Sequence, residues 1–301
     1  MAMRIEAVAA LLTACLLSGS GMVAQQYNAV QGYNYAGSLG AGSNPAAIVN
    51  TPYPWDVTIA GLQVQYQTNA VRILDYSLIG SPARSKFQVI GGEFARFGCS
   101  VSNANIFNTR IAWGRKRAVA FGANIRTFSD IKTSEYSYKD TVSSIGSYVE
   151  LNRQNGPFTG ELRNSSILEL FASYGQTIVD RAGYRLNAGV TVKINRGISG
   201  FRADVDDVDM VTINSGDQTD YLLNQGGFTY SYSSNYDRWN DQVSDKNNIS
   251  EFLKATKTGF SFGIGVELLV KSGISSGMED EEAYYDYDWK IGVSLMDMGT
   301  L

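Results

Sequence analysis

Histidine is absent from the 301-residue chain, which also has only 5 prolines and 2 cysteines. Histidine is the commonest metal ligand and the usual general base near neutral pH. An enzyme built from this sequence would therefore have to work with carboxylates, lysine, tyrosine or serine. The net charge of −4 and the pI of about 5.0 leave no basic surface, which excludes nucleic acid as a partner.

Long hydrophobic runs are also missing. Beyond the N-terminal segment, no stretch approaches the ~18 apolar residues that a membrane-spanning helix needs. This absence excludes a helical membrane protein.

The N-terminus has the features of an export signal. Arg4 precedes an apolar stretch from Ala7 to Leu17, and the segment ends in small residues. We predict a signal peptide over residues 1–24, cleaved after Ala24. A lipoprotein box at "LTAC", with lipid on Cys15, and a retained anchor are the alternatives. Removal of residues 1–24 would leave Cys99 as the only cysteine and would exclude an intrachain disulfide.

What the chain does contain favours antiparallel β-structure. It has 31 glycines, 18 tyrosines and 13 phenylalanines, a composition typical of large antiparallel β proteins. From Tyr184 to Ile194 every second residue is apolar, and the residues between are Arg185, Asn187, Gly189, Thr191 and Lys193. Such strict alternation predicts a strand with one apolar and one polar face.

Turn spacing predicts the arrangement of the strands. Residues 25–56 lack periodicity and are expected to form a plug, loop or short helix before the strands of residues 57–301. Tight turns at 114–117 and 180–183 alternate with long polar stretches at 129–166 and 197–257, which we expect to be loops. Short turns at one end and long loops at the other are the layout of a transmembrane β-barrel.

Strand length and side-chain chemistry predict which face is outside. The expected strands of about 10–13 residues match the roughly 9–11 residues of a tilted strand that crosses a bilayer. Arg185, Asn187, Thr191 and Lys193 suit a watery lumen, whereas Tyr184 and Trp289 lie at strand starts, where an aromatic girdle forms. We therefore expect the apolar face to contact lipid. On this assignment Val190→Arg is damaging and Thr191→Arg is tolerated.

Three short motifs resemble known outer-membrane barrels. "SNPAA", Ser43 to Ala47, resembles the Asn-Pro-Ala segment of the long-chain fatty-acid transporter superfamily. "LNAGVTVKINRG" and "WKIGVSLMDMG" resemble an uncharacterised branch of outer-membrane β-barrels, within or near that superfamily, that is common in Bacteroidota. The matching positions are Gly189, Lys193, Gly197, Trp289, Gly292, Asp297 and Gly299. The resemblance runs from about residue 43 onward and implies a barrel of roughly fourteen strands with an N-terminal plug.

The chain departs from that pattern at its end. We count about eight strands, and Leu301 follows a Gly-Thr turn where such barrels finish on an aromatic residue. We therefore expect a fragment of a longer barrel, truncated at its C-terminus, with "DWKIGVSLMD" as an open edge. A complete eight-stranded barrel is the alternative.

Candidate sites are few, and each has a simpler interpretation. "DVDDVDM" (204–210) offers oxygens for calcium but lacks the glycine and distal glutamate of an EF-hand loop. "GRKR" (114–117) could contact phosphate or lipid headgroups, and "SYSSNYD" (231–237) could stack on a sugar. "GISSG" (273–277) has the outline of a nucleophile elbow without a histidine partner, and "MEDEE" (278–282) is a charged run. Charged turns and solvated loops explain all of them, so we assign no catalytic, cofactor-binding or metal-binding residue and expect no enzyme.

These observations lead to an expected function. We expect an outer-membrane β-barrel that transports or binds a small hydrophobic compound and is surrounded by outer-membrane lipid. The alternatives are a structural or secretion-accessory barrel whose loops bind other proteins, and a secreted soluble β protein with adhesive loops. Charged residues at positions 185 and 193 fit a lumen better than the core of a soluble sandwich.

Overall fold

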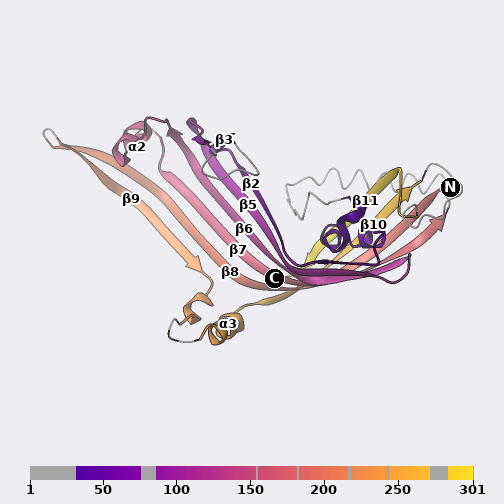
Figure 1. Ribbon diagram of the computed structural model, residues 1–301. Coiled ribbons are helices and arrows are strands. Elements are labelled where there is room, and N and C mark those ends of the chain that lie inside the picture. Colours follow the sequence, from indigo (N-terminus) through magenta and orange to yellow (C-terminus); the bar gives the residue numbers. More distant parts are fainter. Residues whose placement is uncertain are drawn as a thin grey trace.

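The computed structural model describes residues 32–75, 86–153, 155–181, 183–215, 218–240, 242, 244–271 and 284–300. The expected signal peptide, with Cys15 and Ala24, lies outside these residues, as do "GISSG" and "MEDEE". The described chain is predominantly antiparallel β-sheet (Figure 1). In this part of the chain no helix has the length and apolarity to cross a membrane.

The main sheet contains nine of the described strands. Its order is β1-β5-β6-β7-β8-β10-β11, with β2 also paired to β5 and β9 also paired to β8. The strands are β1 (Trp55–Thr58), β2 (Gly61–Thr68), β5 (Gly92–Ala112), β6 (Arg117–Tyr138), β7 (Phe158–Arg181), β8 (Tyr184–Ser215), β9 (Gln218–Tyr232), β10 (Thr258–Val270) and β11 (Trp289–Gly299). β3 (Val71–Asp75) and β4 (Lys86–Val89) form a separate pair.

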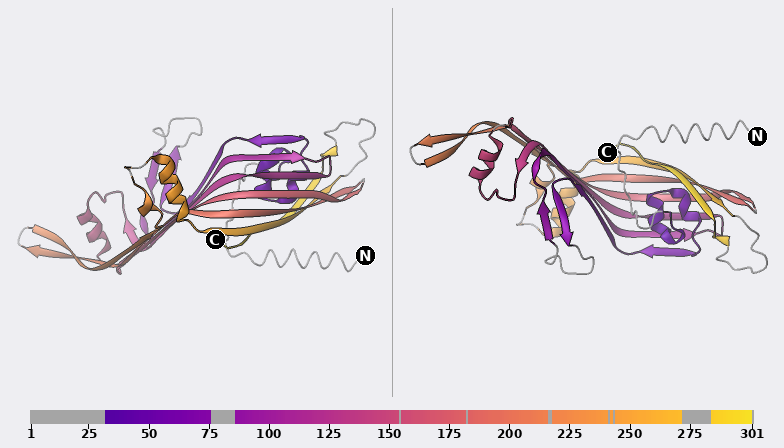
Figure 2. Two further views of the ribbon diagram at one scale, coloured as in Figure 1. Left: turned by 90° about the horizontal axis from the view of Figure 1, so that it is seen from below. Right: turned by 90° about the horizontal axis from the view of Figure 1, so that it is seen from above.

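The main sheet is curved and open (Figures 1 and 2). Among the described strands, β11 pairs only with β10, and β1 and β2 pair only with β5. The sequence prediction that "DWKIGVSLMD" is an open edge agrees with this arrangement, and Trp289, Ile291 and Val293 of this strand are exposed.

The long strand β8 divides the sheet into two halves. Residues Tyr184 to Arg196 pair with β10, whereas Phe201 to Ser215 pair with β9 on the same edge. The half with β10 and β11 forms a trough around the N-terminal helical turns, and the other half extends away from it (Figure 1).

Short helices occupy the connections. The 3₁₀ helices η2 (Asn34–Gly42) and η3 (Pro45–Val49) lie in the trough, and we call residues 34–50 the plug. α2 (Ile145–Asn152) joins β6 to β7, and η5 (Tyr236–Arg238) and α3 (Asp245–Lys254) join β9 to β10. The segment before the strands, for which the sequence predicts a plug, a loop or a short helix, contains η2 and η3 in its described part.

The alternating residues take the predicted faces. On β8, Val190 is 49 % exposed on the convex side, whereas Lys193 is 4 % exposed on the concave side. β10 alternates in the same way, with exposed Phe260, Phe262, Ile264 and Val266 and buried Ser261 and Glu267. The apolar residues are therefore outside and the polar residues inside, the reverse of a soluble core.

Two sequence predictions about this sheet are wrong. The stretches 129–166 and 197–257 are not mainly loops, because β6, β7 and β8 continue far into them and β9 lies within the second. β5 to β8 consequently have 21, 22, 24 and 32 residues, and only β10 and β11, with 13 and 11, have the expected length. Polar residues on both faces obscured these extensions, because alternation is visible only where one face is apolar.

The third correction concerns the water-filled lumen. Thr191 is only 1 % exposed, and its hydroxyl lies 2.6 Å from that of Ser173 beneath the plug. An arginine at position 191 would therefore enter a filled space, so the expectation that Thr191→Arg is tolerated is wrong.

Candidate functional site

The plug contacts the sheet through one sharp turn. Asn44 caps η3 by accepting a hydrogen bond from the Ala46 amide at 2.9 Å, and Pro45 occupies the first helical position. The Asn44 amide also donates to the Val266 carbonyl of β10 at 3.1 Å, and Ser294 of β11 donates to the Ser43 carbonyl at 2.7 Å. The "SNPAA" motif is therefore a docking element between the N-terminal segment and the wall.

A row of glycines receives this turn. Gly175, Gly189 and Gly265 are direct register partners on β7, β8 and β10. A Cβ atom on Gly189 would lie 2.4 Å from the Pro45 carbonyl carbon, and one on Gly265 would lie 2.1 Å from Asn44 Oδ1. Only glycine allows the plug backbone to approach the sheet this closely.

Arg110 of β5 forms hydrogen bonds with the other side of the plug and with the residues that follow it. Its side chain is 1 % exposed and donates to the carbonyls of Ile48 at 2.5 Å, Tyr53 at 2.7 Å and Thr51 at 3.4 Å. The carboxylate of Asp56 lies 3.9 Å away. The guanidinium thus binds the Ile48 carbonyl in the last turn of η3, where carbonyls lack a partner in the helix, and two carbonyls of the segment that follows.

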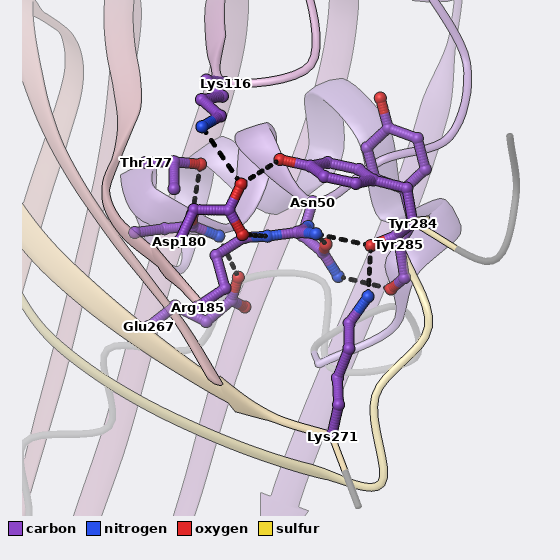
Figure 3. Close-up of polar contacts among 10 residues, drawn as sticks. Asn50, Lys116, Thr177, Asp180, Arg185, Glu267, Lys271, Tyr284 and Tyr285 are labelled. Atoms are coloured by element: carbon purple, nitrogen blue, oxygen red, sulfur yellow. Dashed lines mark hydrogen bonds and ion pairs between the residues drawn. The ribbon is translucent and has the colours of Figure 1, made fainter. Parts of the chain in front are cut away.

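At the end of the trough with the tight turns, Arg185 links the plug to the β10–β11 connection (Figure 3). Arg185 donates to Asn50 Oδ1 at 3.0 Å and to the Tyr284 carbonyl at 2.6 Å. Its guanidinium carbon also lies 3.6 Å from the centre of the Tyr284 ring, a cation–π contact. Asn50 in turn donates to the Tyr285 carbonyl at 3.1 Å. We call these four residues the latch.

Charged neighbours surround the latch (Figure 3). Asp180 accepts a hydrogen bond from the Tyr284 hydroxyl at 3.0 Å and lies 3.2 Å from Lys116. Burial raises the pKa of Tyr284 to about 12, an effect that Arg185 opposes and Asp180 reinforces. Burial also lowers the pKa of Lys271, and nearby Arg185 adds to that lowering. The neutral phenol is the form that this site stabilises.

A second charged cluster lies deeper in the trough. Arg126 Nη1 is 2.7 Å from Glu169 Oε1 and 2.9 Å from Asp297 Oδ2, and Lys193 Nζ is 2.5 Å from Asp297 Oδ1. Arg126, Glu169 and Lys193 are buried. Two cations and two carboxylates therefore neutralise one another between β6, β7, β8 and β11, as a buried charge requires.

A cavity of ≈ 20 Å³ separates this cluster from η2. Arg126 Nε and Asn108 Oδ1 line the region without a hydrogen-bond partner among the described residues. That volume has room for about one water molecule, which could bridge such groups. The space between η2 and this cluster is therefore small.

The motifs singled out in the sequence have other roles. Lys116 and Arg115 of "GRKR" contact Asp180 and the Tyr284 ring, so this turn belongs to the surroundings of the latch. The aspartates of "DVDDVDM" lie on β8, where Asp204 pairs with Arg202 at 2.7 Å. In "SYSSNYD", Tyr232 donates to Asp237 at 2.9 Å. Among the described residues, no three Cys, Asp or Glu side chains are close enough to hold a metal ion.

Residues 45–301 match the family of unknown function DUF5723. The chain belongs to this family. No curated protein and no solved structure matches the chain. The DUF5723 match begins at Pro45, the residue seated on the glycine row, and includes all the described strands, whereas Ser43 and Asn44 of the docking turn precede it.

Sequence reasoning did not identify the latch or the glycine row. Asn50, Arg185 and Tyr284 are far apart in the sequence and carry no motif spacing. The one available signal was the recurrence of glycine on the polar face of otherwise regular strands, at Gly189 and Gly265, since glycine in a strand often marks close backbone approach.

Proposed function

We propose that this DUF5723 protein is an outer-membrane β-barrel protein that binds or transports a small hydrophobic compound. The observation that carries this proposal is the inverted sheet. Phe260, Phe262, Ile264 and Val266 project outward from one strand, while the inner face buries Glu169, Arg185 and Lys193. Such a wall is stable where the outside is hydrocarbon and the inside is protein or water.

The convex face supports a lipid environment in a second way. A shallow hollow of ≈ 430 Å³ lies on that face of β7, β8, β10 and β11, opposite the plug. Its rim is almost entirely apolar and includes Ile178, Val190, Val266 and Leu295. Exposed apolar surface of this kind marks a membrane or binding face.

The proposal includes closure of the open sheet into a barrel. In hydrocarbon an unpaired row of backbone N–H and C=O groups costs several kcal/mol per group. The edges at β11 and at β1 and β2 therefore require partner strands in a membrane, and a closed barrel with strands beyond those described here supplies them.

The plug suggests how such a barrel would be gated. It is held mainly by hydrogen bonds from Arg110, Arg185 and Ser294 and buries only a small apolar cluster around Ile48 and Phe171. Water can replace hydrogen bonds at a small net cost, so a plug held in this way is released more readily than one buried in a large apolar core.

Cell fractionation tests the localisation. The full-length chain, expressed with its own N-terminus, is expected in the outer-membrane fraction, resistant to carbonate extraction, and mass spectrometry should find Gln25 as the first residue. A diacylglycerol on Cys15 would favour the lipoprotein alternative. Recovery of the protein in the soluble secreted fraction would overturn the membrane proposal.

One observation favours a second function, the binding of other proteins. β9 pairs only with β8 among the described strands and exposes Phe228, Tyr230 and Tyr232 on one face. Neighbouring ring centroids in this row are 5.8 and 6.4 Å apart. An exposed strand edge beside aromatic side chains suits β-strand addition by a partner. Loss of co-purifying secretion proteins on Tyr230→Ser, with Tyr33→Ser as control, would support it.

A further inference from the structure

A cavity of ≈ 330 Å³ lies at the end of the sheet away from the plug, between α2 and the far half of β8. This volume falls within the ≈ 300–1,000 Å³ of small-molecule sites. Its walls are largely apolar and include Tyr148, Val149, Phe158, Val205, Val208 and Met210. Arg153, Asn155 and Asp209 supply polar groups at the same cavity.

A β-bulge builds one wall of this cavity. Val205 and Val208 are three residues apart, so a regular strand would place them on opposite faces. The register of β8 shifts between Asp206 and Asp209, and Asp207 has a φ of 47°. The bulge brings both valines to the cavity, which is how bulges re-aim side chains. The "DVDDVDM" segment thus forms an apolar wall of the cavity through Val205, Val208 and Met210.

α2 forms the opposite wall and is firmly held. Ser144 and Ser147 form a capping box at its start. Asn152 at its end accepts from the Ser137 amide at 2.6 Å and donates to the Ser137 carbonyl at 3.0 Å. The ring of Tyr136 meets Tyr148 and Phe158 edge-on, at 5.9 and 5.8 Å between centroids. The cavity is therefore preformed.

We propose that this cavity binds a small aromatic compound with one polar substituent. This compound would be the hydrophobic ligand of the proposed function, and the biological role of the cavity rests on that function. Tyr148 and Phe158 offer aromatic contacts, and Met210 offers an adaptable thioether. The polar substituent meets Arg153 or Asn155 at the rim. Asp209 is already held by Asn224 at 2.9 Å, so its carboxylate is partly satisfied.

Photolabelling with 4-hydroxybenzophenone tests this site in the full-length protein. The compound is aromatic, carries one hydroxyl group and forms covalent adducts with neighbouring C–H groups on illumination. We expect labelling that saturates with probe concentration and maps by mass spectrometry to the peptides around Tyr148–Phe158 and Val205–Met210. Saturable labelling confined to the convex face of β10 and β11 would overturn the proposal.

Two tryptophan substitutions provide the matched comparison. Met210→Trp fills the cavity from an already part-exposed position and should weaken saturable labelling about tenfold, which corresponds to ~1.4 kcal/mol. Ile145→Trp adds the same side chain to α2 at a residue that is 72 % exposed and does not line the cavity, and should leave labelling unchanged. Equal effects of the two variants would refute the site.

The fractionation result separates the two proposals. Saturable labelling at α2 in a protein that is not in the outer membrane would keep the site and remove the membrane function. Outer-membrane localisation without saturable labelling would remove the site and leave the membrane proposal standing.

Discussion

Adding one methyl group to the glycine row should displace the plug. In Gly189→Ala, the new Cβ would lie 2.4 Å from the Pro45 carbonyl carbon, 2.5 Å from its oxygen and 2.6 Å from the Ala46 nitrogen. These are backbone atoms, so no side chain can rotate away. Ordinary contacts begin near 3.4 Å, and the turn must therefore retreat by about 1 Å.

That retreat has a definite energetic consequence. Overpacking of this kind costs about 1–3 kcal/mol. The movement would also strain the hydrogen bonds from Asn44 to Val266 and from Ser294 to Ser43, which are 3.1 and 2.7 Å long. We expect the plug to leave its seat in a larger fraction of molecules, while the sheet itself remains folded.

Cysteine accessibility measures this fraction. With the natural cysteines replaced, Ala46→Cys places a thiol at a fully buried residue of the plug itself. We expect Gly189→Ala to raise its rate of maleimide labelling by about tenfold or more, since ~1.4 kcal/mol changes an equilibrium constant tenfold.

Gly197→Ala is the matched control on the same strand. A Cβ there has no neighbour within 4 Å, so the substitution should leave labelling unchanged and stabilise the strand slightly, by roughly 0.5–1 kcal/mol at most. The close contact between the plug and Gly189 would be refuted if Gly189→Ala were labelled no faster than the parent. It would also be refuted if Gly197→Ala were labelled as fast as Gly189→Ala.

Three further predictions test the outer face, the buried charges and the latch. Val190→Arg should destabilise the membrane-inserted protein by about 2–4 kcal/mol if it lies near the bilayer midplane, and Val190→Leu should not; equal refolding yields in lipid would contradict a lipid-facing position. Glu169→Ala leaves Arg126 and Lys193 with one carboxylate and should lower the free energy of unfolding by about 3–5 kcal/mol, more than Glu169→Gln does. An unchanged midpoint in thermal or denaturant unfolding would show that the cluster does not contribute to stability. Burial raises the pKa of Tyr284 to about 12, so the contribution of this phenol to stability should be complete below the ordinary phenol pKa of ~10 and be lost as the pH rises through about 12. The difference between alkaline absorbance titrations of the parent and of Tyr284→Phe should show one late-titrating phenol. A difference that titrates at a pH of about 10 would refute the buried latch.

Strand extension shows where reading the sequence fails. The alternation of Tyr184 to Ile194 predicted both the strand and its two faces correctly, because one face there is apolar without interruption. β8 nevertheless continues to Ser215 through a segment with aspartates on both faces and a bulge at Asp207. In that segment the strand is maintained by pairing with β7 and β9, which local periodicity does not reveal.

The sequence alone determined the antiparallel β class, the polar and apolar faces, and the short connections from β5 to β6 and from β7 to β8. These follow from local periodicity and turn chemistry, which neighbouring residues express by themselves. Only the tertiary structure decided that Gly175, Gly189 and Gly265 form one row, that Pro45 rests on it, and that Arg185 joins Asn50 to Tyr284. Those contacts depend on strand register and on residues far apart in the sequence, such as Arg185 and Asn50, which are separated by 135 positions. Register is set by the pairing of whole strands and not by any one of them.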